Sequence, residues 1–382
     1  MNLDYKTYEI IIVNDGSTDT TLDVIIENFN LRKVQRPIQK KIMTADHIGI
    51  YENTTESGVL ITLIDKLNGG KADSINVGVN ASRYPYFVCM DSDSILEVDS
   101  LTKIVNPILE HEDVIAVGSN IHISNDSIFE NGKLVELRLP QKIIPAMQVL
   151  EYERSFLASR IFLDRFNANL IISGAFGLFS KEAVIKVGGY QTDSMGEDME
   201  LIVKLHSFYR ANDLPYQIKY SHEAVCWTQV PEQLGDLVKQ RRRWHIGLFQ
   251  SLKQHKNLYR TGSYLYYLVY ELLSPFIELF GLFIILLGSV FELLNIKYML
   301  FFLLVYALFG SMLTLISFLT RNYLSDATIR KRDIFRAFVL VIPENIFLRF
   351  VLALTRMTAL LFYRGDETDW GSIQRVKINY KS

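Results

Sequence analysis

The sequence has little cysteine and almost no net charge, and each of these two features excludes a class of protein. Cys89 and Cys226 are its two cysteines in 382 residues, too few for a disulfide framework or a cysteine-rich metal site. Lysine and arginine total 40 against 42 aspartates and glutamates, a net charge of −2. A chain without a basic surplus lacks the charge that binds phosphates along a nucleic acid, so we expect no nucleic-acid partner.

Charge is also scarce in one part of the chain, beyond about residue 260. Residues 298–319 contain no charged side chain, and residues 276–291 contain one. Stretches of this length and composition can cross a lipid bilayer. A third apolar stretch, residues 335–363, also contains arginines, and it fits either a third span or a helix lying in the membrane interface. We therefore predict a membrane domain over residues 261–363, with spans at about 272–294 and 298–320, and a tail over 364–382.

Basic residues mark the ends of these apolar stretches. They cluster before the first one, in "KQRRRWHIGLFQSLKQHKNLYR", and between the second and the third, at Arg330, Lys331 and Arg332. Positively charged flanks stay on the cytoplasmic side of a membrane. The sequence therefore predicts a multi-pass protein of the cell membrane, with residues 1–260 forming a domain in the cytoplasm.

Before residue 260, apolar strand patterns alternate with helix patterns. In the first unit, the apolar run at residues 10–13 ends in Asn14-Asp15-Gly16, and a helix pattern follows Ser17 and Thr18. Such alternation predicts an α/β domain with a largely parallel sheet. In open α/β sheets, ligands bind beyond the carboxyl ends of the strands. Asp15 lies at such an end and is a candidate binding residue.

Two acidic motifs follow in the same domain. Asp91-Ser92-Asp93 comes directly after the apolar run at residues 86–90, and its two carboxylates can share a hard cation such as Mg²⁺ or Mn²⁺. Glu197-Asp198 opens a predicted helix, where a carboxylate can act as a general base. Both motifs also fit structural roles, as an acidic turn and as acidic residues that complement a helix dipole.

Three further motifs combine small, basic and aromatic residues. Lys71 follows two glycines, so its ammonium group can approach a phosphate. Gly174 belongs to "SGAFGLF", a run of mainly small residues. The run "QRRRW" at residues 240–244 offers an aromatic platform for a sugar and guanidinium groups for a diphosphate. A solvated lysine, close packing and a membrane-interface anchor are the alternatives for these three motifs.

Together and in this order, the motifs resemble those of the family-2 processive glycosyltransferases, which include cellulose, chitin, hyaluronan and poly-N-acetylglucosamine synthases. The resemblance covers roughly residues 8–320, and "NGGKADSINVGVNAS", "DSDSILEVDSL" and "QRRRWHIGLFQSL" look most like the bacterial poly-N-acetylglucosamine synthases. It implies a GT-A domain, Rossmann-like and doubly wound, followed by transmembrane helices. It also implies an inverting transfer of sugar from a UDP-sugar, with UDP-N-acetylglucosamine expected, to a growing exopolysaccharide of the biofilm type.

The resemblance assigns a role to each motif. Asp198 becomes the catalytic base that deprotonates the acceptor hydroxyl. The remaining residues fall into three groups, with nucleotide-sugar binding by Asp15, Lys71 and Asp91, metal binding by Asp93, and acceptor or pyrophosphate binding by Gln240, Arg243, Trp244 and Gly174. The implied cofactor is Mg²⁺ or Mn²⁺. The implied partners are the UDP-sugar, the polysaccharide acceptor, the bilayer and a small membrane helper subunit.

The chain departs from this family at its first strand, because residues 1–8 match only the short run before the family's second strand. We therefore expect an N-terminally truncated synthase that binds UDP poorly. The first alternative is an inactive remnant or a scaffold of an export complex. The second is a transferase that places a single sugar on a lipid carrier, although Gln240, Arg243 and Trp244 are typical of chain-extending members.

Overall fold

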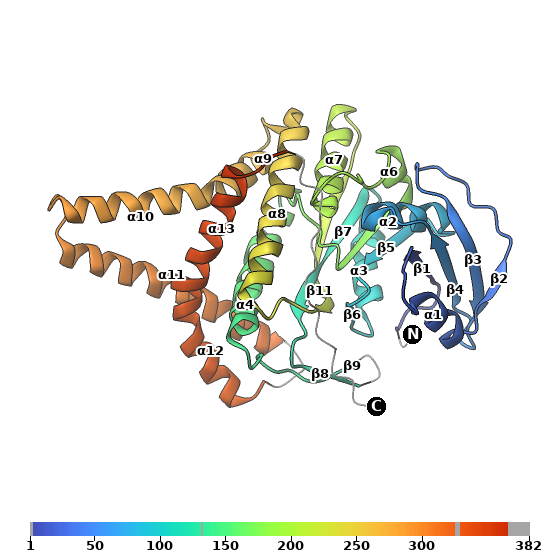
Figure 1. Cartoon of the computed structure of the whole chain (residues 1–382), viewed down its shortest axis with the longest axis horizontal. Helices are drawn as coiled ribbons and strands as arrows, with labels where there is room; N and C mark the ends of the chain where they lie inside the picture. Colours follow the sequence, from blue (N-terminus) through green and yellow to red (C-terminus); the bar gives the residue numbers. More distant parts are fainter. Residues whose placement is uncertain (1–2, 131–132, 325–328, 366–382) are drawn as a thin grey trace.

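The computed structural model describes residues 3–130, 133–324 and 329–365 (Figure 1). In this part of the chain, strands and helices alternate up to β11, and only helices follow. The prediction of an α/β domain followed by apolar helices is confirmed. Of the predicted tail, residues 366–382 lie outside the described residues.

The first sheet has the strand order β1-β4-β3-β2. Its strands are β1 (Glu9–Asp15), β4 (Leu60–Lys66), β3 (His47–Thr54) and β2 (Arg32–Val34). Side chains alternate between the two faces of β4, so Leu63 packs with α1 (Thr21–Asn28) and Ile64 with α2 (Gly70–Ala81). Burial on both faces makes β4 the centre of this sheet.

The second sheet has the order β5-β10-β7-β11-β6, and it is mixed. Its strands are β5 (Tyr86–Met90), β10 (Phe176–Ser180), β7 (Val114–Ile123), β11 (Gln217–Thr228) and β6 (Ile95–Leu96). β7 and β11 run parallel, as do β1 and β4, whereas β10 is antiparallel to both of its neighbours. The expectation of a largely parallel sheet therefore holds for only part of the structure, because alternating helix and strand patterns do not encode strand direction.

The remaining elements connect or cover these sheets. A hairpin of β8 (Ile128–Glu130) and β9 (Lys133–Glu136) follows β7. The helices of the α/β part are α3 (Ser100–Glu110), α4 (Ile143–Arg154), α5 (Ile161–Asp164), α6 (Lys181–Lys186), α7 (Glu197–Ala211) and α8 (Leu234–Gln254). A π-helical segment, η1 (Ser155–Arg160), joins α4 to α5.

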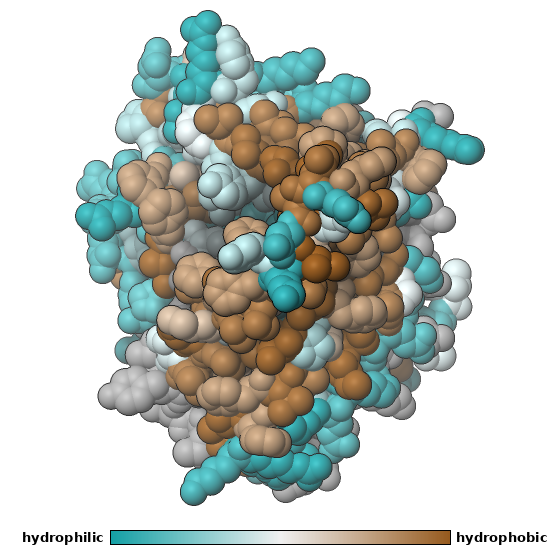
Figure 2. All heavy atoms as spheres, turned by 90° about the vertical axis from the view of Figure 1, so that its left-hand side faces the viewer, coloured by the Kyte–Doolittle hydropathy of each residue, from teal (hydrophilic) through white to brown (hydrophobic). Residues whose placement is uncertain are grey.

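Three helical stretches after α8 are long and apolar enough to cross a membrane: Gly262–Val290, Ile296–Thr320 and Lys331–Leu361. They contain α9 (Gly262–Tyr266), η3 (Tyr267–Leu273), α10 (Ser274–Val290), α11 (Ile296–Leu324), α12 (Lys331–Pro343), η4 (Glu344–Leu348) and α13 (Arg349–Leu361). α10 and α11 project as a hairpin from the left of Figure 1, and Figure 2 shows the apolar face that they present. The third stretch, α12 to α13, lies across the α/β part instead (Figure 1).

The apolar helices share a core with the α/β part. Phe318, Ala337 and Val341 belong to the same buried cluster as Leu150 of α4 and Val117 of β7. The cluster therefore runs without interruption from the second sheet, through α4, to α11 and α12.

The two sheets also meet at edges that make no strand pairs. β1 and β5 are edge strands of their sheets, and the N–H of Arg83 donates to Glu9 Oε1 at 2.6 Å where both strands begin. α2 contributes to buried clusters beside both edges, with Val77 in the cluster that includes Val13 of β1 and Val79 in the one that includes Cys89 of β5. Within the described residues, no strand pairs with β1 on this side or with β5 on its outer side.

Candidate active site

A cavity of about 550 Å³ lies between the α/β part and the apolar helices. Its walls come from the carboxyl end of β5, the turn before β10, the start of α7, α4, α8, η3 and α13. Nearly all of the residues that the sequence predicted for the site line it, namely Lys71, Asp91, Asp93, Gly174, Asp198, Gln240, Arg243 and Trp244. Asp15 is not among the lining residues.

Lys71 joins two of the acidic motifs. Its Nζ lies 2.7 Å from Asp91 Oδ1 and 3.1 Å from Glu197 Oε1. Burial acts to lower the pKa of Lys71, but the charges of Asp91 and Glu197 outweigh it and hold the pKa above its ordinary value. Burial and the charge of Asp198 raise the pKa of Glu197. The ammonium group therefore balances part of the negative charge at this end of the cavity.

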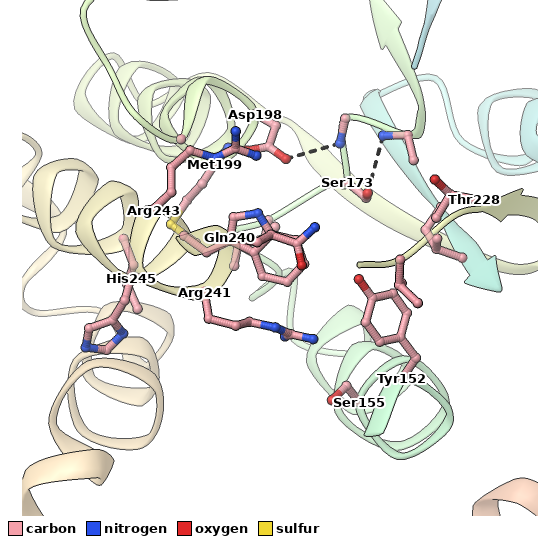
Figure 3. A pocket seen from close by; sticks show the side chains of 18 of the residues that line it. Tyr152, Ser155, Ser173, Asp198, Met199, Thr228, Gln240, Arg241, Arg243 and His245 are labelled. Carbon is pink, nitrogen blue, oxygen red and sulfur yellow. Dashed lines mark hydrogen bonds between the residues drawn. The ribbon is translucent and has the colours of Figure 1, made fainter. Parts of the chain in front are cut away.

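Asp198 is held by backbone N–H groups. Its Oδ2 accepts from the N–H of Gly174 at 3.1 Å (Figure 3), and its Oδ1 accepts from the N–H of Met199 at 2.8 Å. A Cβ atom at Gly174 would lie 3.0 Å from Lys71 Nζ and 3.6 Å from Asp198 Oδ2. A glycine at this position therefore lets the turn before β10 approach both charged groups closely.

A second close approach fixes α7 relative to α8. Gly196, directly before Glu197, packs against Gly247 of α8. A Cβ atom at Gly247 would lie 2.8 Å from the backbone N of Gly196. The two acidic residues at the start of α7 are therefore placed by backbone contact with the helix that carries Trp244.

α8 supplies a polar and aromatic wall of the cavity. Gln240 Oε1 is buried and has no hydrogen-bond partner in the part of the chain that the structure describes. Trp244 is 40% exposed. In Figure 3 the Arg241 side chain of α8 points toward Tyr152 at the end of α4, and its Cζ lies 5.7 Å from the centre of that ring. A hydroxyl group of a sugar could donate a hydrogen bond to Gln240 Oε1, and a sugar ring could stack on the indole.

The acidic end of the cavity fits a divalent cation by donor type. Asp91 and Asp93 both line it and offer the carboxylate oxygens that Mg²⁺ and Mn²⁺ prefer. Among the described residues, no group of three or more His, Cys, Asp or Glu is arranged to hold a metal ion. One or two carboxylates with diphosphate oxygens and water are a common environment for Mg²⁺, so these two aspartates suffice when a nucleotide supplies the rest.

Asp15 lies at the start of α2 instead of in the cavity wall. Its carboxylate accepts from the N–H groups of Gly69 and Gly70, each at 2.8 Å, and pairs with the buried Lys66. Burial acts to raise the pKa of Asp15, but the bonds from Lys66, Gly69 and Gly70 lower it. Asp15 therefore fixes the helix that carries Lys71, and its predicted nucleotide contact stays a prediction.

Three acidic residues that line the cavity were given no site role of their own from the sequence: Glu197, Glu151 and Glu271. Glu197 was noted only as the neighbour of Asp198, although it is the second partner of Lys71. Glu151 of α4 pairs with Arg241 of α8. The signal for Glu151 was the one charged residue in the largely apolar run "AMQVLEY", which indicates a buried charge but not its partner.

Comparisons with known sequences identify the family. Residues 86–319, more than half of the chain, match the model for glycosyl transferase family group 2. A poly-β-1,6-N-acetyl-D-glucosamine synthase of Staphylococcus epidermidis is 30% identical over 250 residues, which are 65% of this chain and 49% of that protein. The synthase of Staphylococcus aureus strain COL is 32% identical over 245 residues, 64% of this chain and 48% of that protein. The chain spans about half the length of the curated relatives it matches.

A solved structure supports the fold. The mannosyltransferase PcManGT of Pyrobaculum calidifontis, in complex with GDP-Man and Mn²⁺, superposes with a TM-score of 0.54 and is 15% identical. The match covers 94% of this chain and 80% of that one. At this identity the likeness concerns the fold alone. With the family match, it follows that this chain belongs to glycosyl transferase family group 2 and is a glycosyltransferase of GT-A fold.

Proposed function

We propose that the chain is a membrane-bound, inverting transferase that adds sugar from a UDP-sugar to a growing exopolysaccharide. The observation that carries this proposal is one continuous cavity. It reaches from Asp91 and Asp198 past Trp244 to the apolar helices, where Tyr267 and Arg356 line it. The relatives named poly-β-1,6-N-acetyl-D-glucosamine synthases favour UDP-N-acetylglucosamine as the donor, with UDP-glucose as the second candidate.

The acidic end of the cavity is the proposed donor site. Asp91 and Asp93 would hold a divalent cation, Mg²⁺ or Mn²⁺, which supplies positive charge against the departing diphosphate. The neighbour solved with GDP-Man and Mn²⁺ supports this assignment. Lys71 would give up its contact with Asp91 and pair with a phosphate oxygen of the donor. The divalent cation would then be the positive partner of Asp91, so that neither the phosphate nor the carboxylate lacks a positive charge beside it. Asp15 assists by holding the start of α2, which carries Lys71.

Asp198 is the proposed general base. The N–H groups of Gly174 and Met199 fix its carboxylate in one orientation. It takes the proton of the acceptor hydroxyl as that oxygen bonds to the anomeric carbon and the diphosphate leaves. A single displacement inverts the anomeric configuration. Gln240, Trp244 and Gly174 border the acceptor in this proposal, and Arg243 neutralises charge on the diphosphate.

The proposed domain division places residues 1–260 at the cytoplasmic face and residues 261–363 in the membrane. The three long apolar helical stretches and the apolar surface in Figure 2 support the membrane part. Arg330, Lys331 and Arg332, which precede or begin α12, support the orientation. The open edges of β1 and β5 support the proposal that the α/β domain lacks one strand, because backbone groups there have no strand partner in the described structure.

The test is sugar incorporation by the chain in lipid nanodiscs, from labelled UDP-N-acetylglucosamine and from labelled UDP-glucose. Asp198→Asn removes the base while keeping its shape, and we expect incorporation to fall by roughly 10²- to 10⁴-fold, as for the loss of a general base. Asp213→Asn is the matched control, since Asp213 is exposed just after α7 and outside the cavity lining. Equal activity of the chain and Asp198→Asn would contradict the assigned base.

The products separate the alternatives. A labelled polymer supports the proposed synthase, whereas a single labelled sugar on lipid supports transfer to a lipid carrier. No incorporation by the folded 382-residue chain, or by the same chain with an added upstream segment taken from a relative, would favour a scaffold.

A further inference from the structure

Arg241 is buried in the wall of the cavity although it carries a charge, and its contacts lead to Trp244. Its side chain is 6% exposed. Its Nη2 donates to Glu151 Oε2 at 2.9 Å, and its Cζ lies 4.5 Å from the centre of the Trp244 ring. A guanidinium group at this distance stacks on the indole and restrains its orientation. Glu151, Arg241 and Trp244 therefore form a continuous chain of contacts from α4 to the surface of the cavity.

Glu151 is also the point at which three helices meet. It lies on α4, Arg241 lies on α8, and Arg356 of α13 places its Nη2 3.9 Å from the other carboxylate oxygen, Oε1. The Glu151 side chain is 9% exposed, so this charge is nearly removed from solvent. Loss of the carboxylate would leave Arg241 buried without the one acidic partner that the described residues give it.

We propose that Glu151 is a positioning residue of the acceptor site. Its carboxylate orients the guanidinium of Arg241, and Arg241 fixes the ring of Trp244 so that one face is presented to a sugar of the acceptor. Glu151 acts through Arg241, because its carboxylate accepts from Arg241 and the guanidinium of Arg241 lies over the Trp244 ring. This inference rests on the proposed function, since it takes Trp244 as the platform for the acceptor.

The test compares two substitutions on the same helix. Glu151→Gln keeps the shape of the side chain and removes its charge. Glu153→Gln is the matched control, because Glu153 is also buried in α4 but pairs with His122, 3.3 Å away, instead of with Arg241. The full chain and both variants are prepared in lipid nanodiscs with 5-fluorotryptophan. Trp244 then gives its own fluorine-19 signal, identified by its absence in Trp244→Phe.

We expect Glu151→Gln to shift or broaden the Trp244 signal and to leave the signals of the other tryptophans in place. With a β-1,6-linked N-acetylglucosamine oligosaccharide as the acceptor, its KM should rise by roughly tenfold, the scale of one lost charge-assisted hydrogen bond. The kcat value and the KM for UDP-N-acetylglucosamine should change much less. Arg241→Lys keeps the charge but loses the planar group, so it should move the same fluorine signal.

Two results would overturn the inference. One is a Trp244 signal and an acceptor KM that are both unchanged in Glu151→Gln. The other is an equal change in Glu153→Gln, which would mean that α4 is merely destabilised. Failure of the unsubstituted chain to transfer sugar would instead overturn the proposed function. The fluorine signal would then still decide whether Glu151 positions Trp244.

Discussion

His206 is a buried titratable residue outside the cavity lining, and its hydrogen bonds define its protonation. Its Nε2 lies 3.0 Å from the carbonyl oxygen of Asn169, and its Nδ1 lies 2.7 Å from the hydroxyl of Tyr216. A carbonyl oxygen only accepts, so Nε2 carries the proton and Nδ1 accepts from the tyrosine. Burial lowers the pKa of His206 from 6.5 to about 4.

This lowered pKa makes stability depend on pH. Below pH 6.5 the unfolded chain takes up a proton that folded His206 binds only near pH 4. The free energy of unfolding therefore falls as the pH drops from 6.5 to 4, by up to about 1.4 kcal/mol per pH unit from this residue. His206→Gln cannot titrate, so its Tm should fall less between pH 7 and pH 5 than that of the unsubstituted chain. His111 is exposed, so His111→Gln serves as the control. An equal fall in Tm in all three proteins would contradict the prediction.

At this scale, the sequence predicted which residues line the cavity better than it predicted their contacts. Lys71, Asp91 and Asp198 were recognisable because each stands in a short motif whose chemistry is local. The contact of Lys71 with Glu197 joins residues far apart in the chain, so no spacing rule reveals it. Asp15 shows the same limit, because a strand-end carboxylate can either bind a ligand or fix a helix start, and its neighbours decide which.

Helix α8 carries the proposed acceptor-binding residues, and its contact with the start of α7, between Gly247 and Gly196, leaves no room for a side chain. We predict that Gly247→Ala lowers sugar transfer by about tenfold or more, since displacements of about 1 Å can cost far more than that. The added Cβ would lie 2.8 Å from the backbone N of Gly196, so α8 or the start of α7 must move. Incorporation of labelled sugar and Tm are the measurements.

The same helix offers a matched control in Gly235→Ala. A Cβ atom at Gly235 meets nothing within 4 Å among the described residues. Alanine is a better helix former than glycine by roughly 0.5–1 kcal/mol, so this variant should keep its activity and melt at the same or a higher temperature. Full activity in Gly247→Ala would show that the contact between α7 and α8 does not place Asp198.

Sequence periodicity predicted reliably whether a segment is a helix or a strand. It did not predict the direction in which a strand pairs with its neighbours. The helix that Glu197-Asp198 opens and the strand before "DSD" occur as expected, as α7 and β5. The antiparallel direction of β10 was not foreseen, since its sequence shows an apolar run in either orientation. The π-helical segment η1 was also missed, because a change from four-residue to five-residue hydrogen bonding leaves little trace in composition.

For the whole molecule, composition alone located the change from an α/β part to apolar helices near residue 260. It did not predict that α11 and α12 join the main core through Phe318, Ala337 and Val341. Lipid chains and protein cores favour the same apolar side chains, so hydropathy cannot tell a helix face that meets lipid from one that meets protein. The polar contacts between the two parts carry that information.

Arg154 is the clearest of these polar connections. Its two terminal nitrogens each lie 3.1 Å from a carboxylate oxygen of Glu344 in η4, and Nη1 also donates to Thr314 of α11 at 2.6 Å. The Glu344 side chain is 2% exposed and that of Arg154 is 28% exposed, so the Glu344 carboxylate without its partner would be left in a poorly solvated place. We predict that Glu344→Met and Arg154→Met each lower the free energy of unfolding by roughly 2–4 kcal/mol, because each leaves one charge without its partner.

The double variant Arg154→Met/Glu344→Met separates charge pairing from simple packing. Two apolar side chains of similar length replace the pair and leave no buried charge, so the double variant should recover much of the loss and be more stable than Glu344→Met alone. Tm and denaturant unfolding in the same detergent provide the measurement. Losses that simply add would mean that the two charges do not interact, and that the apolar core alone holds the helices to the α/β part.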